Sequence, residues 1–361
     1  MPLLLDNHDL EGLISPAAFV ASLDAAYRDF ATGSGICPPR IDVQSAEVTP
    51  GQNYQLGLAA GMSGSYAALR IKSDVVFQEI VEGRPRKSKY CGKPGQFLGL
   101  VLLFERSQGS LVAILHDGLL QKMRVGADSA LGIRYMARPD AAVLGILGAG
   151  GMARAHIAAI AGVRPIRTIR IYSPTARNRE VLAREVRVEH GIDAIAVETP
   201  EAVYEGADVV ASCASAIGPV IEGRHLRPGM HVTCIGGTLD SAANGLIDVA
   251  LRFGLAPPPA EAPDLRLEDE CLTFSEGGRK AGHGGTRRYA LVPDERRVSF
   301  AELLSGSRPG RTGADQITFS ERGNIHGLQF AAVAGQLYEA ARASGIGRPL
   351  PADLFYQSIR N

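Results

Sequence analysis

The sequence has no excess of either charge. Its 361 residues contain 38 Lys and Arg and 38 Asp and Glu, so the formal net charge at pH 7 is zero. A chain without excess positive charge needs no basic surface for a phosphate backbone, so we expect no nucleic-acid partner. The same balance permits copies of the chain to associate closely.

Long hydrophobic runs and paired cysteines are also missing. No apolar stretch approaches the roughly 20 residues that a membrane-spanning helix needs. Residues 1–14 lack the basic-then-apolar pattern of a secretion signal. The five cysteines form no C-x-x-C pair, and Cys213 and Cys234 lie in apolar, strand-like runs, which predicts buried free thiols. We therefore expect a cytoplasmic protein with no membrane partner.

What the sequence does contain is a dinucleotide-binding fingerprint. An apolar strand pattern over residues 143–147 leads into Gly148, Gly150 and Ala153, the G-x-G-x-x-A form. The first glycine permits a tight turn, the second lets the backbone approach a pyrophosphate, and the alanine lets the next helix pack against the strand. That helix would direct its N–H groups at the phosphates. The alternative is a glycine-rich turn in another α/β protein. The predicted cofactor contacts here are Gly148, Ala149, Gly150, Gly151, Met152 and Ala153.

Strands and helices alternate after the fingerprint, which calls for a parallel sheet with right-handed crossovers. The predicted strands cover residues 143–147, 168–172, 194–197, 208–212 and 231–235, and helices begin near Gly151, Arg177 and Glu201. The predicted fold class is therefore α/β, with a Rossmann-type parallel-sheet domain (125–314) inserted into an α+β domain built from 1–124 and 315–361.

The flanks have their own patterns. Ser15 and Pro16 mark the start of an N-terminal helix, and residues 55–115 suggest short strands with glycine turns, including a hairpin of 98–104 with 110–115. Further helices are predicted over 125–136 and 326–344. Residues 256–300 predict a long loop with one or two short strands, either a lid or a surface insertion.

The end of the second strand favours NADP(H) over NAD(H). In an NAD site an acidic residue about 20 residues past the fingerprint binds the ribose, but the first carboxylate here is Glu180. Ser173, Thr175 and Arg177 can instead donate hydrogen bonds to a 2′-phosphate, although Ser173 could equally cap the next helix. Residues after the fourth strand are expected to line the nicotinamide side: Ser212, Cys213 and Ala214.

Several weak motifs in a fixed order resemble the ornithine cyclodeaminase/mu-crystallin family. They are residues 38–40 (Pro-Pro-Arg), 69–72 (Leu-Arg-Ile-Lys), 123–127 (Met-Arg-Val-Gly-Ala), the fingerprint, 206–210, 226–232 and 315–319. The resemblance covers most of the chain. It implies a Rossmann-type domain, a substrate-binding domain that forms homodimers, and hydride transfer between nicotinamide and a small amino or imino acid.

Such a substrate carries a carboxylate, which needs fixed positive donors, and an imine accepts hydride more readily once its nitrogen is protonated. By resemblance, Arg40 and Arg124 are the carboxylate ligands and Lys72 is the proton source. Arg124 is expected at a helix start among apolar residues, where a charge is expensive to bury without an anion. The alternatives are a surface arginine at position 40 and an exposed lysine paired with Asp74 at position 72.

The positions at which this sequence differs from the family pattern also bear on which reaction it catalyses. Thr238 stands where cyclodeaminases have an acidic residue, and a hydroxyl cannot act as a carboxylate base; this resembles the ketimine-reductase branch. Val125 replaces the usual threonine, and residues 323–327 lack an acidic residue.

His116 and His231 have no metal-ligand spacing, so we expect no metal. We predict an NADP-dependent imine reductase or amino-acid dehydrogenase. The alternatives are a cyclodeaminase-type lyase that releases ammonia with recycled NAD, and a non-catalytic NADPH-binding protein.

Overall fold

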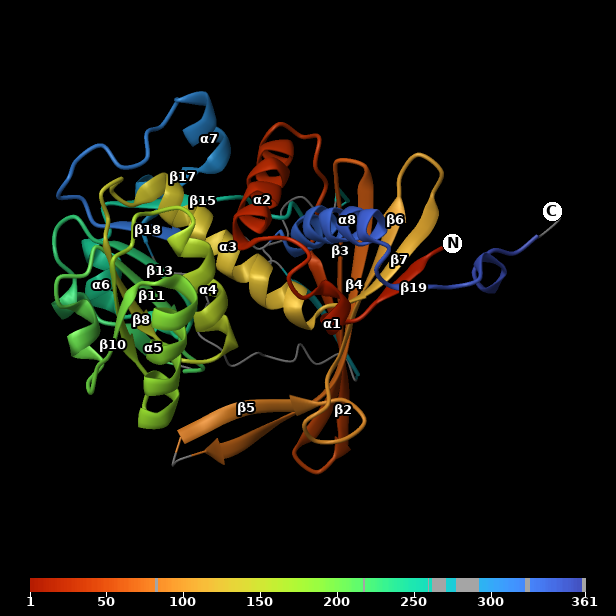
Figure 1. The fold of residues 1–361 in the computed structure, drawn as a ribbon, viewed down its shortest axis with the longest axis horizontal. Helices are drawn as coiled ribbons and strands as arrows, with labels where there is room; N and C mark the ends of the chain where they lie inside the picture. Colours follow the sequence, from red (N-terminus) through yellow and green to blue (C-terminus); the bar gives the residue numbers. More distant parts are fainter. Residues whose placement is uncertain are drawn as a thin grey trace.

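The segment around the fingerprint folds into a parallel sheet. The computed structural model describes residues 1–81, 84–216, 218–258, 260–261, 271–276, 292–321 and 325–358. Within these residues the sheet has the order β10-β9-β8-β11-β13-β18-β15-β17 (Figure 1). Its strands are β8 (Val143–Leu147), β9 (Thr168–Tyr172), β10 (Asp193–Ala196), β11 (Val209–Cys213), β13 (His231–Gly236), β15 (Val249–Arg252), β17 (Arg297–Ser299) and β18 (Thr318–Glu321). The predicted Rossmann-type sheet is thereby confirmed.

Helices connect these strands. They are α4 (Gly151–Ala161), α5 (Ala176–His190) and α6 (Ser241–Leu246), with α7 (Phe300–Ser305) after β17; a small separate pair is formed by β12 (Pro219–Ile221) and β14 (Thr238–Leu239). The helix predicted near Glu201 is instead a single 3-10 turn, η1 (Glu201–Tyr204). Gly206, at φ 66°, ends this turn just before β11, so no room remains for a longer helix.

The rest of the chain forms a mixed sheet. Among the described residues its order is β16-β2-β3-β4-β6-β7-β1-β19, with β5 added to β4. The strands are β1 (Leu3–Leu5), β2 (Arg40–Thr49), β3 (Gln52–Ser63), β4 (Tyr66–Val81), β5 (Arg84–Tyr90), β6 (Leu98–Glu105), β7 (Ser110–His116), β16 (Cys271–Ser275) and β19 (Arg348–Pro349). The predicted hairpin is β6–β7.

Strands β3 and β4 are longer than the predicted short strands, at 12 and 16 residues. The prediction took the glycines of this region as turns, but Gly57 and Gly61 lie inside β3. A Cβ on Gly57 would lie 2.7 Å from Lys72 Cε, and one on Gly61 would lie 2.2 Å from the backbone N of Leu328. These glycines therefore make room for neighbours.

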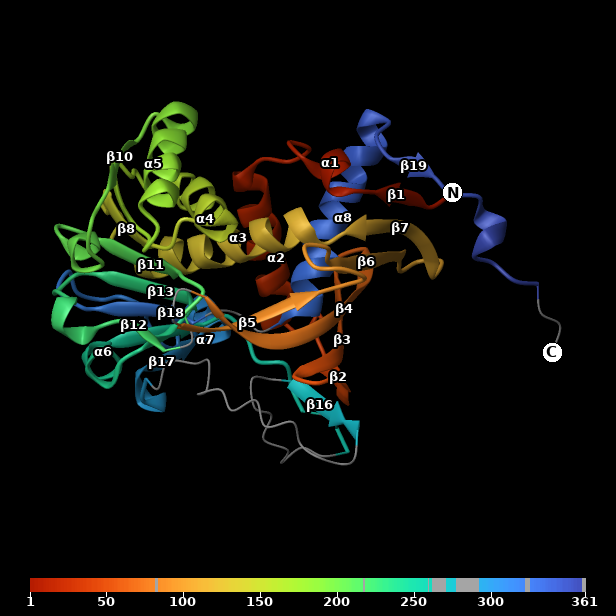
Figure 2. The ribbon, with the colours of Figure 1, turned by 90° about the horizontal axis from the view of Figure 1, so that it is seen from below.

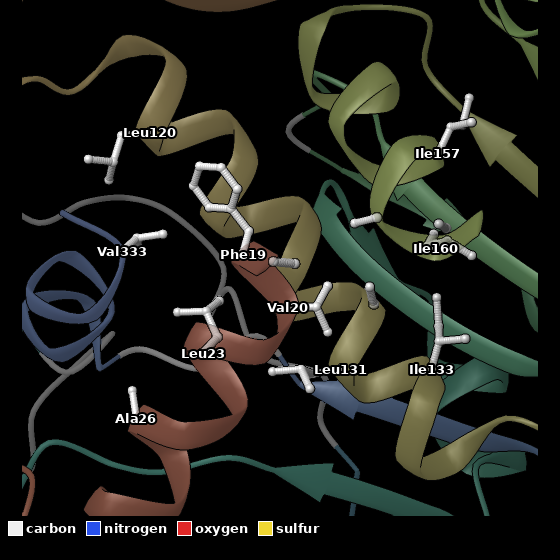
Figure 3. Close-up of a cluster of buried hydrophobic side chains, with 14 of the residues drawn as sticks. Phe19, Val20, Leu23, Ala26, Leu120, Leu131, Ile133, Ile157, Ile160 and Val333 are labelled. Carbon is white, nitrogen blue, oxygen red and sulfur yellow. The ribbon is translucent and has the colours of Figure 1, made fainter. Parts of the chain in front are cut away.

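Four helices pack into a shared core between the sheets: α2 (Pro16–Ala31), α3 (Gly118–Met136), α4 and α8 (His326–Ser344). Figure 3 shows Phe19 and Leu23 of α2 between α3 and Val333 of α8. Ser15 accepts a hydrogen bond from the backbone N of Ala18, as its predicted capping role requires. Helix α1 (Asn7–Leu10) precedes α2. No described helix has both the length and the apolar character needed to cross a membrane.

Helix α3 begins seven residues before its predicted start. Its N-terminus is held by Asn7, whose Oδ1 accepts from the backbone N of Leu119 at 2.9 Å. Because this cap comes from a distant segment, no local signal marks the start of the helix. Arg124 therefore lies inside α3 rather than at its beginning.

Two strands join the other sheet than the predicted domain bounds imply. β18 belongs to 315–361 but pairs with β13 and β15 of the parallel sheet, and β16 belongs to 125–314 but pairs with β2. Figure 2 shows β16 beside β2 at the edge of the mixed sheet. The short strands expected within 256–300 are β16 and β17. The rest of the expected lid or insertion lies largely outside the described residues, as do 323 and 324.

Candidate active site

One face of the mixed sheet carries the predicted Arg40 and Lys72. Asp42 pairs with Gly57 and Gly57 pairs with Lys72, so these residues form one row across β2, β3 and β4. Side chains two residues apart on a strand share a face. Arg40 and Arg70 therefore point to the same side as this row. The sequence analysis did not select Arg70.

Lys72 is held among carboxylates. Its Nζ lies 3.2 Å from Asp74 Oδ2, and the fully buried Asp74 also accepts from Lys89 Nζ at 3.1 Å. Burial lowers the pKa of Lys72, and Lys89 adds to this effect, while Asp74 and Asp42 oppose it. Lys72 is therefore paired with Asp74, as the alternative interpretation expected, but its side chain is mostly buried rather than exposed. A buried ammonium with a lowered pKa releases a proton more readily than a free lysine does.

Arg40 is anchored by Asp42, with NH2 and Oδ2 2.8 Å apart. Burial alone would lower the pKa of Arg40, but Asp42 and Cys271 outweigh it and the pKa is raised. The guanidinium therefore stays charged. Within the described residues, Arg40 Nε and Asp42 Oδ1 are buried without a hydrogen-bond partner, so a donor and an acceptor remain available here.

Arg124 reaches the same region from α3. Its Nε and NH2 donate to Gln121 Oε1 at 3.3 and 2.8 Å, and its NH1 donates to Gln329 Oε1. The guanidinium carbon lies 5.0 Å from the centroid of the Phe330 ring, and that of Arg70 lies 5.1 Å from the same centroid. The expected apolar surroundings are therefore corrected: two amides and an aromatic ring hold this charge.

Arg40 and Lys72 lie on one face of the mixed sheet, Arg124 lies on α3, and all three side chains are largely buried. The side chains of Arg40 and Lys72 are 22% and 19% exposed, and Arg124 is 2% exposed. Arg70 links them, since it lies two residues before Lys72 and against the same ring as Arg124. Its own charge is held by Asp117, which accepts from Nε at 2.8 Å and from NH2 at 2.5 Å.

The fingerprint loop has the geometry that its sequence predicts. Gly148 adopts φ 115°, and its N–H donates to Tyr172 O at 2.8 Å. A Cβ here would lie 2.7 Å from Cys213 O, so only glycine fits. Gly150 is the N-cap of α4, and the space where its Cβ would stand is open. Ala153 is fully buried. This open backbone at a helix N-terminus fits a dinucleotide pyrophosphate.

The ends of β11 and β13 meet beside this loop. Ser212 Oγ donates to Gly236 O at 2.7 Å, and a Cβ on Gly236 would lie 1.8 Å from Ala214 O. Burial raises the pKa of the Cys213 thiol, which favours the protonated form. The predicted residues 212–214 therefore lie at the same edge of the sheet as Gly148.

Thr238 follows this junction on β14, where its backbone N donates to Gly218 O at 3.1 Å. Asp240 does not substitute for the missing carboxylate. It caps α6 by accepting from Ala243 N at 2.7 Å and also accepts from Gly223 N at 3.0 Å.

At the end of β9, Ser173 is buried and does not cap the next helix. The N-cap of α5 is Thr175, whose side chain makes no capping bond, and Arg177 is exposed. Arg179 was not predicted, yet its NH1 donates to Ser173 O at 2.8 Å. A second guanidinium therefore lies beside Ser173 at the end of β9.

Helix α3 connects the sheet face with the fingerprint. A Cβ on Gly126 would lie 2.5 Å from Ala155 O, so α3 and α4 cross here at close range. Lys122, which sequence analysis did not select, lies beside Gly151 at the start of α4: the Gly151 Cβ position is 3.6 Å from its Nζ. Residues two apart on a helix point in nearly opposite directions. Lys122 thus faces the nucleotide loop, while Arg124 is directed to α8, where it contacts Gln329 and Phe330.

A cavity of about 490 Å³ lies elsewhere, at the amino ends of β11 and β13, with Arg138, Asp208 and Arg227 in its lining. None of the predicted site residues lines it. Among the described residues no group of His, Cys, Asp or Glu side chains is arranged to hold a metal ion.

The sequence model of the ornithine cyclodeaminase/mu-crystallin family matches residues 2–345. The chain belongs to this family. A Delta(1)-pyrroline-2-carboxylate reductase of Paracoccus denitrificans is 35% identical over 239 residues, which are 63% of this chain and 69% of that protein. An iminosuccinate reductase of the same organism is 24% identical over 348 residues, which are 96% of this chain and 98% of that protein.

The fold agrees with the family. The structure of Thermococcus litoralis Delta(1)-pyrroline-2-carboxylate reductase in complex with NADH and L-proline is similar, with a TM-score of 0.72 at 23% identity, covering 96% of this chain and 100% of that chain. At this level of identity the likeness concerns the fold. It agrees with a Rossmann-type unit joined to a mixed-sheet unit.

Proposed function

We propose that this chain is an NAD(P)H-dependent reductase of a small imino acid, a ketimine or a cyclic imine, which can also dehydrogenate the corresponding amino acid. The arrangement that supports the proposal is a set of buried cations: Arg40 and Lys72 lie on one sheet face, and Arg124 lies on α3, the helix that crosses α4. Nucleotide binding alone would require none of these three cations. The reductases among its relatives support the same reaction class.

The chemistry follows from the positions of these groups. Arg40 and Arg124 hold the substrate carboxylate, and the unused Arg40 Nε is a donor for it. When bound, a reduced nicotinamide supplies a hydride to the imine carbon. Lys72 gives a proton to the imine nitrogen, so that C=N becomes CH–NH with one hydride and one proton gained. Lys72 then regains a proton from solvent, and Asp74 stabilises the restored ammonium.

The cofactor cradle consists of residues 148–153, with residues 212–214 on the nicotinamide side. We propose NADP(H) as the preferred nucleotide, with NAD(H) weaker. Ser173, Thr175 and Arg177 are proposed ligands of the 2′-phosphate, and Arg179 joins them because its guanidinium lies against Ser173 O.

A homodimer through the mixed sheet is part of the proposal. Helix α8 packs against the face that carries Lys72. The opposite face carries Val43, Met62 and Phe274, which are 40%, 37% and 57% exposed in the single chain. Exposed apolar side chains on one sheet face are typical of a protein interface.

The test is oxidation of NADPH, with NADH alongside, against a panel of cyclic and linear imino acids. We expect turnover with at least one cyclic or linear α-imino carboxylate and a lower Kd for NADPH. Ammonia release from ornithine without net change in NADPH would select the lyase instead. Tight NADPH binding without turnover on the whole panel would select a non-catalytic binding protein. Without a carboxylate at position 238 we do not expect the lyase, and the presence of Arg40, Arg124 and Lys72 argues against a non-catalytic binding protein.

A further inference from the structure

Four buried polar side chains from α2, α3 and α8 form a hydrogen-bond chain that ends on Arg124. Tyr27 donates to Asp128, Gln329 Nε2 donates to Tyr27 Oη at 2.5 Å, and Arg124 NH1 donates to Gln329 Oε1. Tyr27 and Gln329 have no exposed surface, and Asp128 and Arg124 are each 2% exposed. Polar groups this deep in a core are expensive unless they are satisfied.

The chemistry of the two ends fixes the direction of every bond. A guanidinium only donates and a carboxylate only accepts. The Tyr27 hydroxyl therefore donates to Asp128, its oxygen accepts from the Gln329 amide, and the amide oxygen faces Arg124. Burial and then Asp128 raise the pKa of Tyr27 well above its usual value, which keeps this hydroxyl protonated.

The group that meets Arg124 NH1 is consequently a neutral amide. An amide fixes the plane of the guanidinium, together with Gln121 and the Phe330 ring, without bringing a negative charge into contact with NH1. A carboxylate at the same place would fix the plane too, but it would also compete with a carboxylate ligand for the same cation.

We propose that Gln329 is a positioning residue for Arg124: it orients the guanidinium through a neutral acceptor that does not compete with the substrate carboxylate. Tyr27 and Asp128 in turn hold the amide in its one useful orientation. The inference rests on the proposed function, in which Arg124 is a carboxylate ligand.

The test is Gln329→Glu, which keeps the size and shape of the side chain and adds one negative charge. The probe is pyrrole-2-carboxylate, a planar, unreactive carboxylate, titrated into the full-length protein in the presence of NADPH. We expect its Kd to rise by about tenfold or more, with a matching rise in the KM of the imino acid and a smaller change in kcat. The Kd of NADPH should stay near the wild-type value, whereas the melting temperature should fall, because a glutamate cannot donate the hydrogen bond that Gln329 Nε2 gives to Tyr27.

The matched control is Gln336→Glu, the same change two helical turns further along α8. It should leave the affinity for pyrrole-2-carboxylate within about twofold of wild type, because an added charge at that distance interacts weakly with Arg124. A second variant, Gln329→Met, removes the acceptor without adding charge, and should raise KM less than Gln329→Glu does.

The outcomes separate the two proposals. Equal affinity for pyrrole-2-carboxylate in wild type and Gln329→Glu overturns the role of Gln329, even if imino acids are reduced. Wild-type protein that binds NADPH and the carboxylate but reduces no imino acid overturns the proposed reaction. In that case, a rise in Kd in Gln329→Glu still supports the positioning of Arg124.

Discussion

At the scale of single residues, the proton chemistry depends on the carboxylates around Lys72. As a proton donor Lys72 acts in its protonated form, so activity falls as the pH rises through its pKa, which burial lowers. Asp74 opposes that lowering. Asp74→Asn should therefore move the alkaline limb of the kcat/KM profile to lower pH, by about one unit or more.

The measurement is a pH profile of imino-acid reduction for wild type and Asp74→Asn. Asp193→Asn, an exposed change on β10, provides the control and should leave the limb in place. An alkaline limb at the same pH in wild type and Asp74→Asn would argue against Lys72 as the proton donor.

A second residue-scale prediction concerns Lys122. Its ammonium lies beside the first turn of α4, where a pyrophosphate would bring two negative charges. Lys122→Gln should weaken NADPH and NADH by a similar factor, about threefold to tenfold, because the pyrophosphate is common to both. Fluorescence titration at two salt concentrations checks this, and the affinity of the variant should depend less on salt.

Arg134→Gln is the matched control for Lys122, since Arg134 is an exposed cation on the same helix near its other end. It should leave both dissociation constants unchanged. Equal losses in the two variants would mean that the effect is one of overall charge rather than of contact with the cofactor.

The sequence identifies some of these residues and not others for a physical reason. Arg40, Lys72 and Arg124 come from the family resemblance, because their motifs lie in contiguous segments. Gln329 and Arg70 act through contacts with distant parts of the chain, and no local pattern marks a residue whose partner is 205 positions away, as Arg124 is from Gln329. Such partners emerge only when helices and strands are packed.

At the scale of elements, α3, which carries Arg124, crosses α4, which follows the fingerprint loop. A Cβ on Gly126 would lie 2.5 Å from the backbone carbonyl of Ala155, which cannot move aside as a flexible side chain could. Gly126→Ala should lower the free energy of unfolding by about 1–3 kcal/mol and separate the helices slightly. It should also weaken NADPH binding and raise the KM of the imino acid together.

Gly245→Ala provides the comparison. Gly245 lies in α6 with open space where a Cβ would stand, so alanine there should be neutral or stabilise by up to about 1 kcal/mol. Denaturant unfolding of the two variants measures the difference. If Gly126→Ala unfolds like Gly245→Ala, then the crossing tolerates separation and does not couple the two sites.

Element boundaries were predictable where the signal is local. Helix α2 has its own cap at Ser15, and β8 is a buried apolar run before glycines, so both follow from the sequence. The start of α3 does not, because Asn7 caps it from elsewhere. The pairing of β16 with β2 is also invisible locally, since a short strand carries no information about which sheet it joins.

At the scale of the whole molecule, the chain leaves the mixed sheet, builds the parallel sheet with one return to the mixed sheet at β16, and comes back through α8. Both termini lie on the mixed-sheet side in Figure 1. Helix α8 then places Phe330 against Arg70 on the sheet face that carries Lys72, and Gln329 against Arg124 of α3. The proposed substrate site is therefore complete only after the end of the chain has folded back onto the beginning.

The opposite face of the mixed sheet gives the last prediction. Val43 lies on β2 next to Phe274 of β16, and both side chains are partly exposed on the face that points away from Lys72. If this face is the dimer interface, Val43→Glu places a charge in the contact at both copies and should shift the protein from dimer to monomer at micromolar concentration. Val188→Glu, on the exposed surface of α5, is the matched control and should stay dimeric. Sedimentation velocity measures both variants, with NADPH binding retained in each as evidence that the nucleotide unit is intact. A Val43→Glu protein that sediments as wild type does would move the interface away from this sheet face.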